Sequence, residues 1–276
     1  MNRRRFLQAA CGVAGAAVAV PTLGACWGFA ESTHVAITRP TISVPRLPQA
    51  FRGFTIAFLT DIHFGPFVSR EYVASLVRTT AALEADLIVL GGDYTHRSED
   101  AVEPCFEMLA GLQAPSGVVG VLGNHDYMGR VERTQTAMKK AGVHELTNEG
   151  TWLERGSDRL KLAGIDDLWY GKPDVRCALG DAKSNDICLL VSHNPDVAET
   201  LSDRRVSLML SGHTHGGQVA LPGFRGAFTP SRYGGKYAQG LVAAPKTQIY
   251  VSAGTGMSVV PIRINCRPEI ALITLV

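Results

Sequence analysis

The sequence has little charge of either sign and few thiols. Of its 276 residues 19% are charged, and the formal net charge is +2. It contains no basic stripe interleaved with aromatic residues, so nothing in it predicts a nucleic-acid-binding surface. The six cysteines are scattered and predict small buried side chains rather than a disulfide framework. Cys188 lies inside an apolar run, which favours that interpretation over a bridge to Cys177.

The N-terminal region also lacks a hydrophobic run of ordinary transmembrane length. Its apolar stretch, residues 9–20, is shorter than the roughly 20 residues that span a bilayer. Arg3-Arg4-Arg5-Phe6-Leu7 precedes that stretch and matches a twin-arginine export pattern. We therefore expect residues 1–26 to be a twin-arginine signal peptide or a membrane anchor, with an ordinary Sec leader as the alternative. Cys26 also follows a lipoprotein-like processing sequence, so lipid attachment there stays open.

The leader implies that the twin-arginine translocase is a partner during export. Export by this route predicts that the protein lies in the periplasm or on the outer face of the cytoplasmic membrane. Residues 27–50 carry three prolines and are expected to form a linker and a lead-in strand. Residues 51–276 are long enough for one large domain.

Apolar runs alternate with amphipathic segments in that domain. We expect helices over residues 69–84, 99–112 and 131–141, with Ser69 as a helix N-cap and Gly142 ending the third. Further apolar runs predict strands between and after these helices. The alternation favours a layered α/β fold.

Five of the predicted strands end in Asp, His or Asn, and five of the eight histidines lie at these ends. Ligand sites of α/β sheets form outside the carboxyl ends of the strands. Each motif alone also suits a plain turn or a helix cap, but five in order indicate a metal site. The residues concerned are Asp61 and His63, Asp93, Asn124, His125 and Asp126, His193, and His213 and His215.

Mixed oxygen and imidazole donors suit Mn, Fe or Zn rather than Ca. His213 and His215 lie two residues apart after an apolar run, so their side chains point to the same side. Asp93 follows two glycines in a tight turn, and a carboxylate is the side chain that bridges two cations. Two cations about 3.5–4 Å apart would activate a water and shield the oxygens of a phosphoester.

In order and spacing, these motifs resemble the calcineurin-like metallophosphoesterase family. Gly212–Gln218, Gly164–Asp167 and the tail Pro261–Glu269 are similar to the YkuE/YaeI-type phosphodiesterase branch. The resemblance implies that residues 51–276 form a calcineurin-like phosphoesterase domain. The implied fold class is α/β, a four-layer αββα sandwich of the metallo-dependent phosphatase type.

The resemblance also implies two divalent metal ions, with Mn expected first and Fe or Zn as alternatives. One ion would be bound by Asp61, His63, Asp93 and His215. The other would be bound by Asp93, Asn124, His193 and His213. Metal-bound hydroxide would attack phosphorus, and His125 would act as general acid. Asp126 would orient His125 by accepting a hydrogen bond from its other ring nitrogen.

The implied function is hydrolysis of a phosphodiester, with a substrate derived from lipid or the cell envelope. One alternative is a UDP-2,3-diacylglucosamine pyrophosphatase-like hydrolase of lipid A synthesis. The other is a catalytically silent metal-binding scaffold, which the intact motifs disfavour.

Several other polar residues have open roles. His96 is expected in a solvated loop, with lining of the cleft as the alternative. Arg263 and Glu269 are expected to form a structural ion pair or to contact substrate. Residues 223–241 are expected to form a long surface loop near the site, whose rim residues would be Arg225, Arg232, Tyr233, Lys236 and Tyr237.

Overall fold

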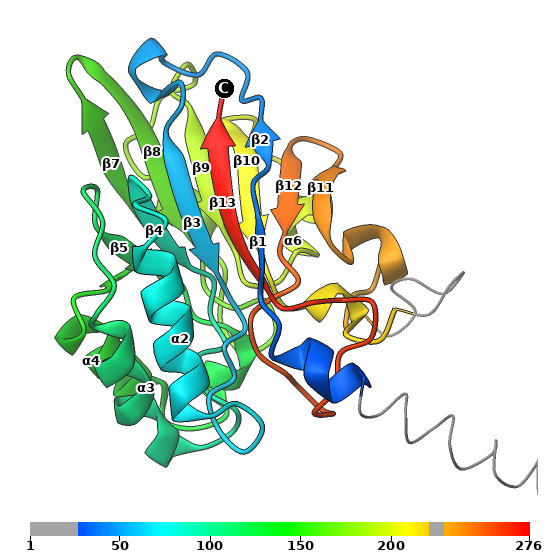
Figure 1. The fold of residues 1–276 in the computed structure, drawn as a ribbon. Coiled ribbons are helices and arrows are strands. Elements are labelled where there is room, and N and C mark those ends of the chain that lie inside the picture. The colour runs from blue at the N-terminus through cyan, green and yellow to red at the C-terminus, as the bar shows by residue number, and fades with distance from the viewer. Residues whose placement is uncertain (1–26, 221–228) are drawn as a thin grey trace, which may run out of the picture.

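The computed structural model describes residues 27–220 and 229–276. They form two mixed β-sheets that pack face to face (Figure 1). The first has the order β1-β13-β3-β4-β5-β6, with β2 pairing with β13, and the second has the order β11-β12-β10-β9-β8-β7. The strands of the first sheet are β1 (Ala36–Thr38), β2 (Thr41–Ile42), β3 (Thr55–Leu59), β4 (Leu87–Leu90), β5 (Val118–Gly120), β6 (His144–Glu145) and β13 (Glu269–Leu275). Those of the second are β7 (Glu149–Arg155), β8 (Asp158–Gly164), β9 (Cys188–Val191), β10 (Val206–Ser211), β11 (Gly240–Ala243) and β12 (Gln248–Val251).

The central strands are apolar because both of their faces are covered. β3, β4 and β5 are parallel, as are β8, β9, β10 and β12. Side chains such as Phe58, Val89 and Leu208 fill the space between the sheets. Such buried parallel strands consist of continuous hydrophobic runs rather than of alternating residues.

Helices cover the outer face of each sheet. The first sheet packs against α2 (Arg70–Ala81), α3 (Val102–Leu109) and α4 (Val131–Lys140), which lie together in Figure 1. The second packs against the short helices α5 (Val175–Leu179) and α6 (Val197–Thr200). This is the predicted four-layer αββα arrangement.

The predicted helix boundaries are close to the observed ones. Ser69 accepts a hydrogen bond from the Tyr72 amide and caps α2. The second helix begins as a 3₁₀ turn, η2 (Glu99–Ala101), and continues as α3. Gly142 follows α4 with φ 75°, a conformation that glycine adopts without strain.

Several elements were not predicted. Residues 27–32 are helical and precede β1 and β2, which lie where a linker and lead-in strand were expected, before the η1 turn (Gln49–Phe51). α5 has only five residues, too few to show a helical period, although Asp174 caps it. Residues 229–241, expected to be loop, contain the 3₁₀ turn η5 (Gly234–Tyr237) and the start of β11.

No helix within residues 27–220 or 229–276 is long and apolar enough to cross a membrane. The export pattern, the apolar stretch 9–20 and Cys26 lie outside the described residues, as does Arg225 of the expected rim loop.

Candidate metal centre

The carboxyl ends of five strands meet at one end of the molecule and supply the predicted ligands. Asp61 and His63 follow β3, Asp93 follows β4, and His193 follows β9. Asn124 opens the 3₁₀ turn η3 (Asn124–Tyr127) after β5, and His213 and His215 follow β10. All seven side chains are buried, although they are polar. Buried polar clusters of this kind need partners, because desolvation without them is costly.

The first predicted set of ligands comes together. The Nε2 atom of His63 lies 3.0 Å from that of His215 and 3.4 Å from Oδ2 of Asp93. Nε2 of His215 is 3.3 Å from Oδ1 of Asp61. Asp61, His63 and His215 could share one metal ion, as could Asp61, Asp93 and His193.

The second set meets on the other side of Asp93. Nε2 of His193 is 3.3 Å from the same Oδ2 atom of Asp93 that faces His63. Nδ1 of His213 lies 3.2 Å from Nε2 of His193. The side-chain oxygen of Asn124 is buried and has no hydrogen-bond partner. An unsatisfied buried oxygen beside imidazole nitrogens fits a cation that binds there.

Hydrogen bonds on the far side of the rings fix which nitrogen faces the site. His193 donates from Nδ1 to the Gly91 carbonyl at 2.8 Å, and His213 donates from Nε2 to the Pro230 carbonyl at 3.0 Å. In the neutral rings, Nε2 of His193 and Nδ1 of His213 therefore carry lone pairs that face each other. Metal-binding histidines are held in this way by carbonyl groups. Two facing lone pairs repel unless a proton or a cation lies between them, so the donors fit metal ions.

Three of the four histidine rings are neutral at neutral pH, and the fourth, His193, is protonated while no metal is bound. Burial lowers the pKa of His63 and of His215, and it lowers that of His213 to about 4. These three rings are therefore neutral and able to ligate at neutral pH. Burial alone would also lower the pKa of His193, but the carboxylate of Asp93 raises it to about 10. His193 must therefore give up a proton before it binds a metal.

The backbone at the site is strained. Asp61, His63, Asp93, His213 and His215 have φ angles between 49° and 70°, in the left-handed region. Non-glycine residues adopt this region rarely, and such residues concentrate at functional sites. The neighbouring glycines allow the close approach. A Cβ atom at Gly212 would lie 2.2 Å from the Asp61 carboxylate, and one at Gly92 would lie 2.5 Å from the Gly123 amide.

The structure contradicts the predicted pairing of Asp126 with His125. The Asp126 carboxylate accepts hydrogen bonds from the amides of Asp93 and Gly123 at 2.9 and 2.8 Å, and from that of Tyr94 at 3.1 Å. Nδ1 of His125 is buried and has no partner. Asp126 therefore joins the two turns that carry Asp93 and Asn124. Sequence analysis missed this role because a backbone amide leaves no signal in the sequence.

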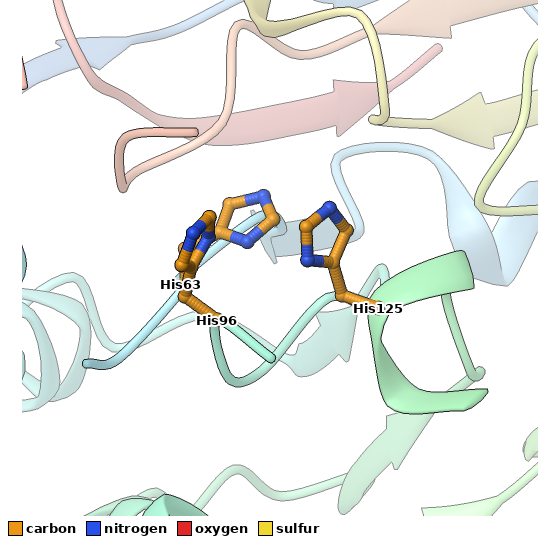
Figure 2. Close-up of side chains that lie close together, drawn as sticks. All are labelled: His63, His96 and His125. Atoms are coloured by element: carbon orange, nitrogen blue, oxygen red, sulfur yellow. The ribbon is translucent and has the colours of Figure 1, made fainter. Parts of the chain in front are cut away.

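His125 itself lines the cleft beside the site, and its amide donates to Oδ1 of Asp93 at 2.7 Å. Burial lowers the pKa of its ring. His96, expected in a solvated loop, is half-buried beside it instead (Figure 2). The His96 ring centroid is 5.3 Å from that of His125 and 5.7 Å from that of His63. The expectation failed because the loop of His96 pairs with the turn after His63, where the His96 amide donates to the Phe64 carbonyl at 3.0 Å.

A cleft of about 620 Å³ opens onto His125, Asn124 and His213. Arg97 is the one Lys or Arg among the described residues that line it. One wall is apolar and includes Trp169, whose ring centroid lies 4.4 Å from that of His213 in a T-shaped arrangement. Neither side chain was singled out from the sequence, since an isolated Trp or Arg in a loop is most often an ordinary surface residue.

Arg263 and Glu269 do not form the ion pair that the sequence suggested. Arg263 is fully buried and donates only to backbone carbonyls and, at longer range, to neighbouring side chains of the described residues. Glu269 accepts from Thr38, Tyr250, Ser252, Gln239 and the Ala253 amide. The two groups therefore have separate structural roles, and neither lines the cleft.

The remaining expected rim residues lie on the loop and make structural contacts. The Arg232 amide donates to Asp196, and Lys236 and Tyr237 contact Glu199. None of Arg232, Tyr233, Lys236 and Tyr237 is among the described residues that line the cleft, but Pro230 of the same loop is.

The sequence and the fold are similar to those of known phosphoesterases and of one solved hydrolase structure. Residues 54–217 match the family model described as calcineurin-like phosphoesterase. The whole chain is 33% identical to the uncharacterized metallophosphoesterase YkuE of Bacillus subtilis, of which it covers 98%. It is 31% identical to the phosphodiesterase YaeI of Escherichia coli, with full coverage of both chains. The sulfate thiohydrolase SoxB of Thermus thermophilus is structurally similar over 83% of this chain and 57% of its own, with 15% identity and a TM-score of 0.51, a likeness of fold alone.

Proposed function

The chain belongs to the calcineurin-like phosphoesterase family, and we propose that it is a phosphodiesterase that uses two divalent metal ions. Asp61, His63, Asp93 and His215 would hold one ion, and Asp93, Asn124, His193 and His213 the other. When bound, such a pair lowers the pKa of a water and neutralises charge on phosphoryl oxygens.

One observation carries the proposal. A single carboxylate oxygen, Oδ2 of Asp93, lies 3.4 Å from Nε2 of His63 and 3.3 Å from Nε2 of His193. The two imidazoles follow strands of different sheets, β3 and β9. A donor shared in this way suits two neighbouring cations better than one.

His125 is proposed to donate a proton to the leaving oxygen. Its ring lines the cleft, and its backbone is held by Oδ1 of Asp93. Burial lowers the pKa of this ring, which makes its protonated form a stronger acid. An anionic phosphodiester beside the ring favours that protonated form. Arg97, which also lines the cleft, would supply a positive charge for a phosphoryl oxygen.

Manganese and export remain part of the proposal. The mixed Asp, Asn and His donors suit Mn, and also Fe or Zn. The twin-arginine pattern at Arg3–Arg5 supports export of the folded protein to the outer face of the cytoplasmic membrane. Export after folding would let the site fill before it meets metals that bind more tightly.

Hydrolysis of bis-p-nitrophenyl phosphate tests the proposal, with Mn, Fe and Zn added separately to the metal-free chain. We expect turnover that depends on metal. His125→Ala should retain the metal content of the wild type and lose roughly 10²–10⁴-fold in kcat, the range for a general acid. His144→Ala is the matched control, because His144 is an exposed histidine outside the site. Metal binding without turnover under any of the three metals would favour the scaffold alternative.

A further inference from the structure

Large apolar side chains are exposed around the mouth of the cleft. Val259 is 80% exposed, and Val260 beside it is 40% exposed. Trp169 and Tyr170, which line the same cleft, are 47% and 56% exposed. Scattered exposed apolar residues are normal, but a group around a functional opening marks a binding surface.

The two valines are held outward by a built support. The Gln218 side chain accepts from the Ser258 amide at 2.9 Å and donates to the Val260 carbonyl at 2.8 Å. The Gln218 amide in turn donates to the carbonyl of the ligand His215 at 2.9 Å. Val259 has φ 63°, a left-handed conformation that is rare for a β-branched residue. A strained and exposed valine, fixed to the metal-binding turn, indicates selection for its position.

The N-terminal helix extends this apolar surface. Trp27 and Phe29 on residues 27–32 are 64% and 59% exposed. Between them, Gly28 lies against Ile262, and its carbonyl accepts from the Arg263 amide at 3.0 Å. Figure 1 shows this blue helix beside the red-orange segment that precedes β13, at the end of the molecule where β3 ends. The helix and the valine loop are thus neighbours on the cleft side.

We propose that these exposed residues form an apolar rim that docks on a lipid bilayer, and that the substrate is a phosphodiester carrying a long alkyl or acyl chain. The rim consists of Trp27, Phe29, Trp169, Tyr170, Val259 and Val260. The proposal rests on the proposed function and names its substrate class. The 26 residues that precede Trp27 include the apolar stretch 9–20 and end at the rim itself. Exposed Trp and Tyr suit the interface of a membrane. Because the rim surrounds the cleft, a rigid protein partner seated on it would close the cleft, whereas a bilayer delivers its own lipids there.

The alkyl chain would lie along the Trp169 and valine walls while Arg97 faces the phosphate. The ring centroids of Trp169 and His213 are 4.4 Å apart, so the apolar wall reaches one of the predicted ligands. A chain placed there leaves water and adds a hydrophobic contribution to binding.

Quenching of Trp169 fluorescence tests docking without relying on catalysis. In the full chain carrying Trp27→Phe and Trp152→Phe, Trp169 is the remaining tryptophan. Vesicles of brominated phosphatidylcholine should quench it, and Val259→Asn with Val260→Asn should reduce that quenching. Asn tolerates the left-handed region better than Val, so this pair should fold normally. Unquenched Trp169 on chains that sediment with the vesicles would overturn the docking.

A matched pair of substrates tests the lipid chain. Ethyl p-nitrophenyl phosphate is water-soluble, and hexadecyl p-nitrophenyl phosphate, with the same leaving group, is presented in phosphatidylcholine vesicles. The ratio of kcat/KM for hexadecyl over ethyl should fall about tenfold in the double valine variant, as expected for lost apolar contact. Leu241→Asn, on an exposed leucine of β11 outside the cleft lining, should keep the wild-type ratio.

The outcomes separate the two proposals. No hydrolysis of either ester would contradict the phosphodiesterase function, while quenching would still report docking. Hydrolysis of both esters with an unchanged ratio in the valine variant would overturn the lipid substrate. Absence of quenching in the protein that keeps both valines, together with an unchanged ratio in the valine variant, would leave the rim to a protein partner and would overturn the bilayer as its occupant.

Discussion

Replacement of the buried Arg263 by methionine should destabilise the metal centre from behind. The guanidinium donates to the carbonyls of Ala253, Gly254, Gly256 and Cys266 at 2.6–3.2 Å. The turn that it braces packs directly on Asp61. The Gly256 amide donates to the Asp61 carbonyl at 2.7 Å. Arg263→Met keeps an unbranched apolar side chain, although a shorter one, and removes every donor.

The expected loss follows from these contacts. The carbonyls of Ala253, Gly256 and Cys266 would lose the donors of Arg263, whereas that of Gly254 keeps the Glu269 amide at 2.9 Å. Three buried carbonyls left without a donor cost about 1–1.5 kcal/mol each, roughly 3–4 kcal/mol in all. Arg263 forms no ion pair among the described residues, so its charge is buried at a desolvation cost. The methionine variant does not bear that cost, which offsets part of the lost stability. We therefore expect the free energy of unfolding to fall by about 2–3 kcal/mol. For a chain of this size, that lowers Tm by roughly 5–10 °C.

Thermal unfolding of the metal-free protein measures the effect without a contribution from bound metal. Arg263→Lys keeps the charge and some donors, so it should lose less than Arg263→Met. Arg267→Met is the control, because Arg267 is exposed near the same turn, and it should stay within about 0.5 kcal/mol of the wild type. If Arg263→Met also stayed within that range, water would be satisfying the carbonyls and the reasoning would be refuted. Metal affinity should fall with stability in Arg263→Met.

Three further predictions concern the site itself. Asp126→Asn replaces one acceptor of backbone amides by a donor, so it should lower the free energy of unfolding by about 1–3 kcal/mol; a loss of turnover with unchanged unfolding would instead support pairing with His125. Because Asp93 raises the pKa of His193 to about 10, metal binding near neutral pH should release about one proton, and metal affinity should rise with pH up to about 10. Calorimetry in buffers of different ionisation enthalpy measures the release, and buffer-independent heats would contradict it. Gly212→Ala places a methyl group on the Asp61 carboxylate and should abolish metal binding in a titration. Gly53→Ala should not, because its Cβ would meet no other atom, although its φ of 81° strains an alanine there and lowers stability.

The ligands were predictable because they follow the strands directly. A run of apolar residues that ends in Asp, His or Asn identifies both the strand and its carboxyl end, and parallel strands bring those ends to one edge. Asp61, Asp93 and His193 could therefore be placed together before the structure was known. The αββα layers followed from the same runs and from the family resemblance.

The supporting contacts were not predictable, because they join side chains to backbone groups far away in the chain. Asp126 bonds to amides more than 30 residues earlier, at Asp93 and Tyr94. Arg263 donates mainly to backbone carbonyls, which no residue type reveals. α5 and β11 were missed because a single helical turn and a short edge strand carry too little periodicity. Gln218 was visible in the glycine-rich motif, but its support of the valine loop depends on tertiary contact.

The binding of two metal ions across Asp93 is tested most directly by anomalous diffraction from crystals of the Mn-loaded chain, with metal content measured on the same sample. We predict two anomalous peaks, one on each side of Oδ2 of Asp93, and about two Mn ions per chain. In Asp93→Asn both peaks should weaken together, because the shared donor is neutral. A single peak in the wild type, or two peaks that Asp93→Asn leaves unchanged, would contradict the shared carboxylate.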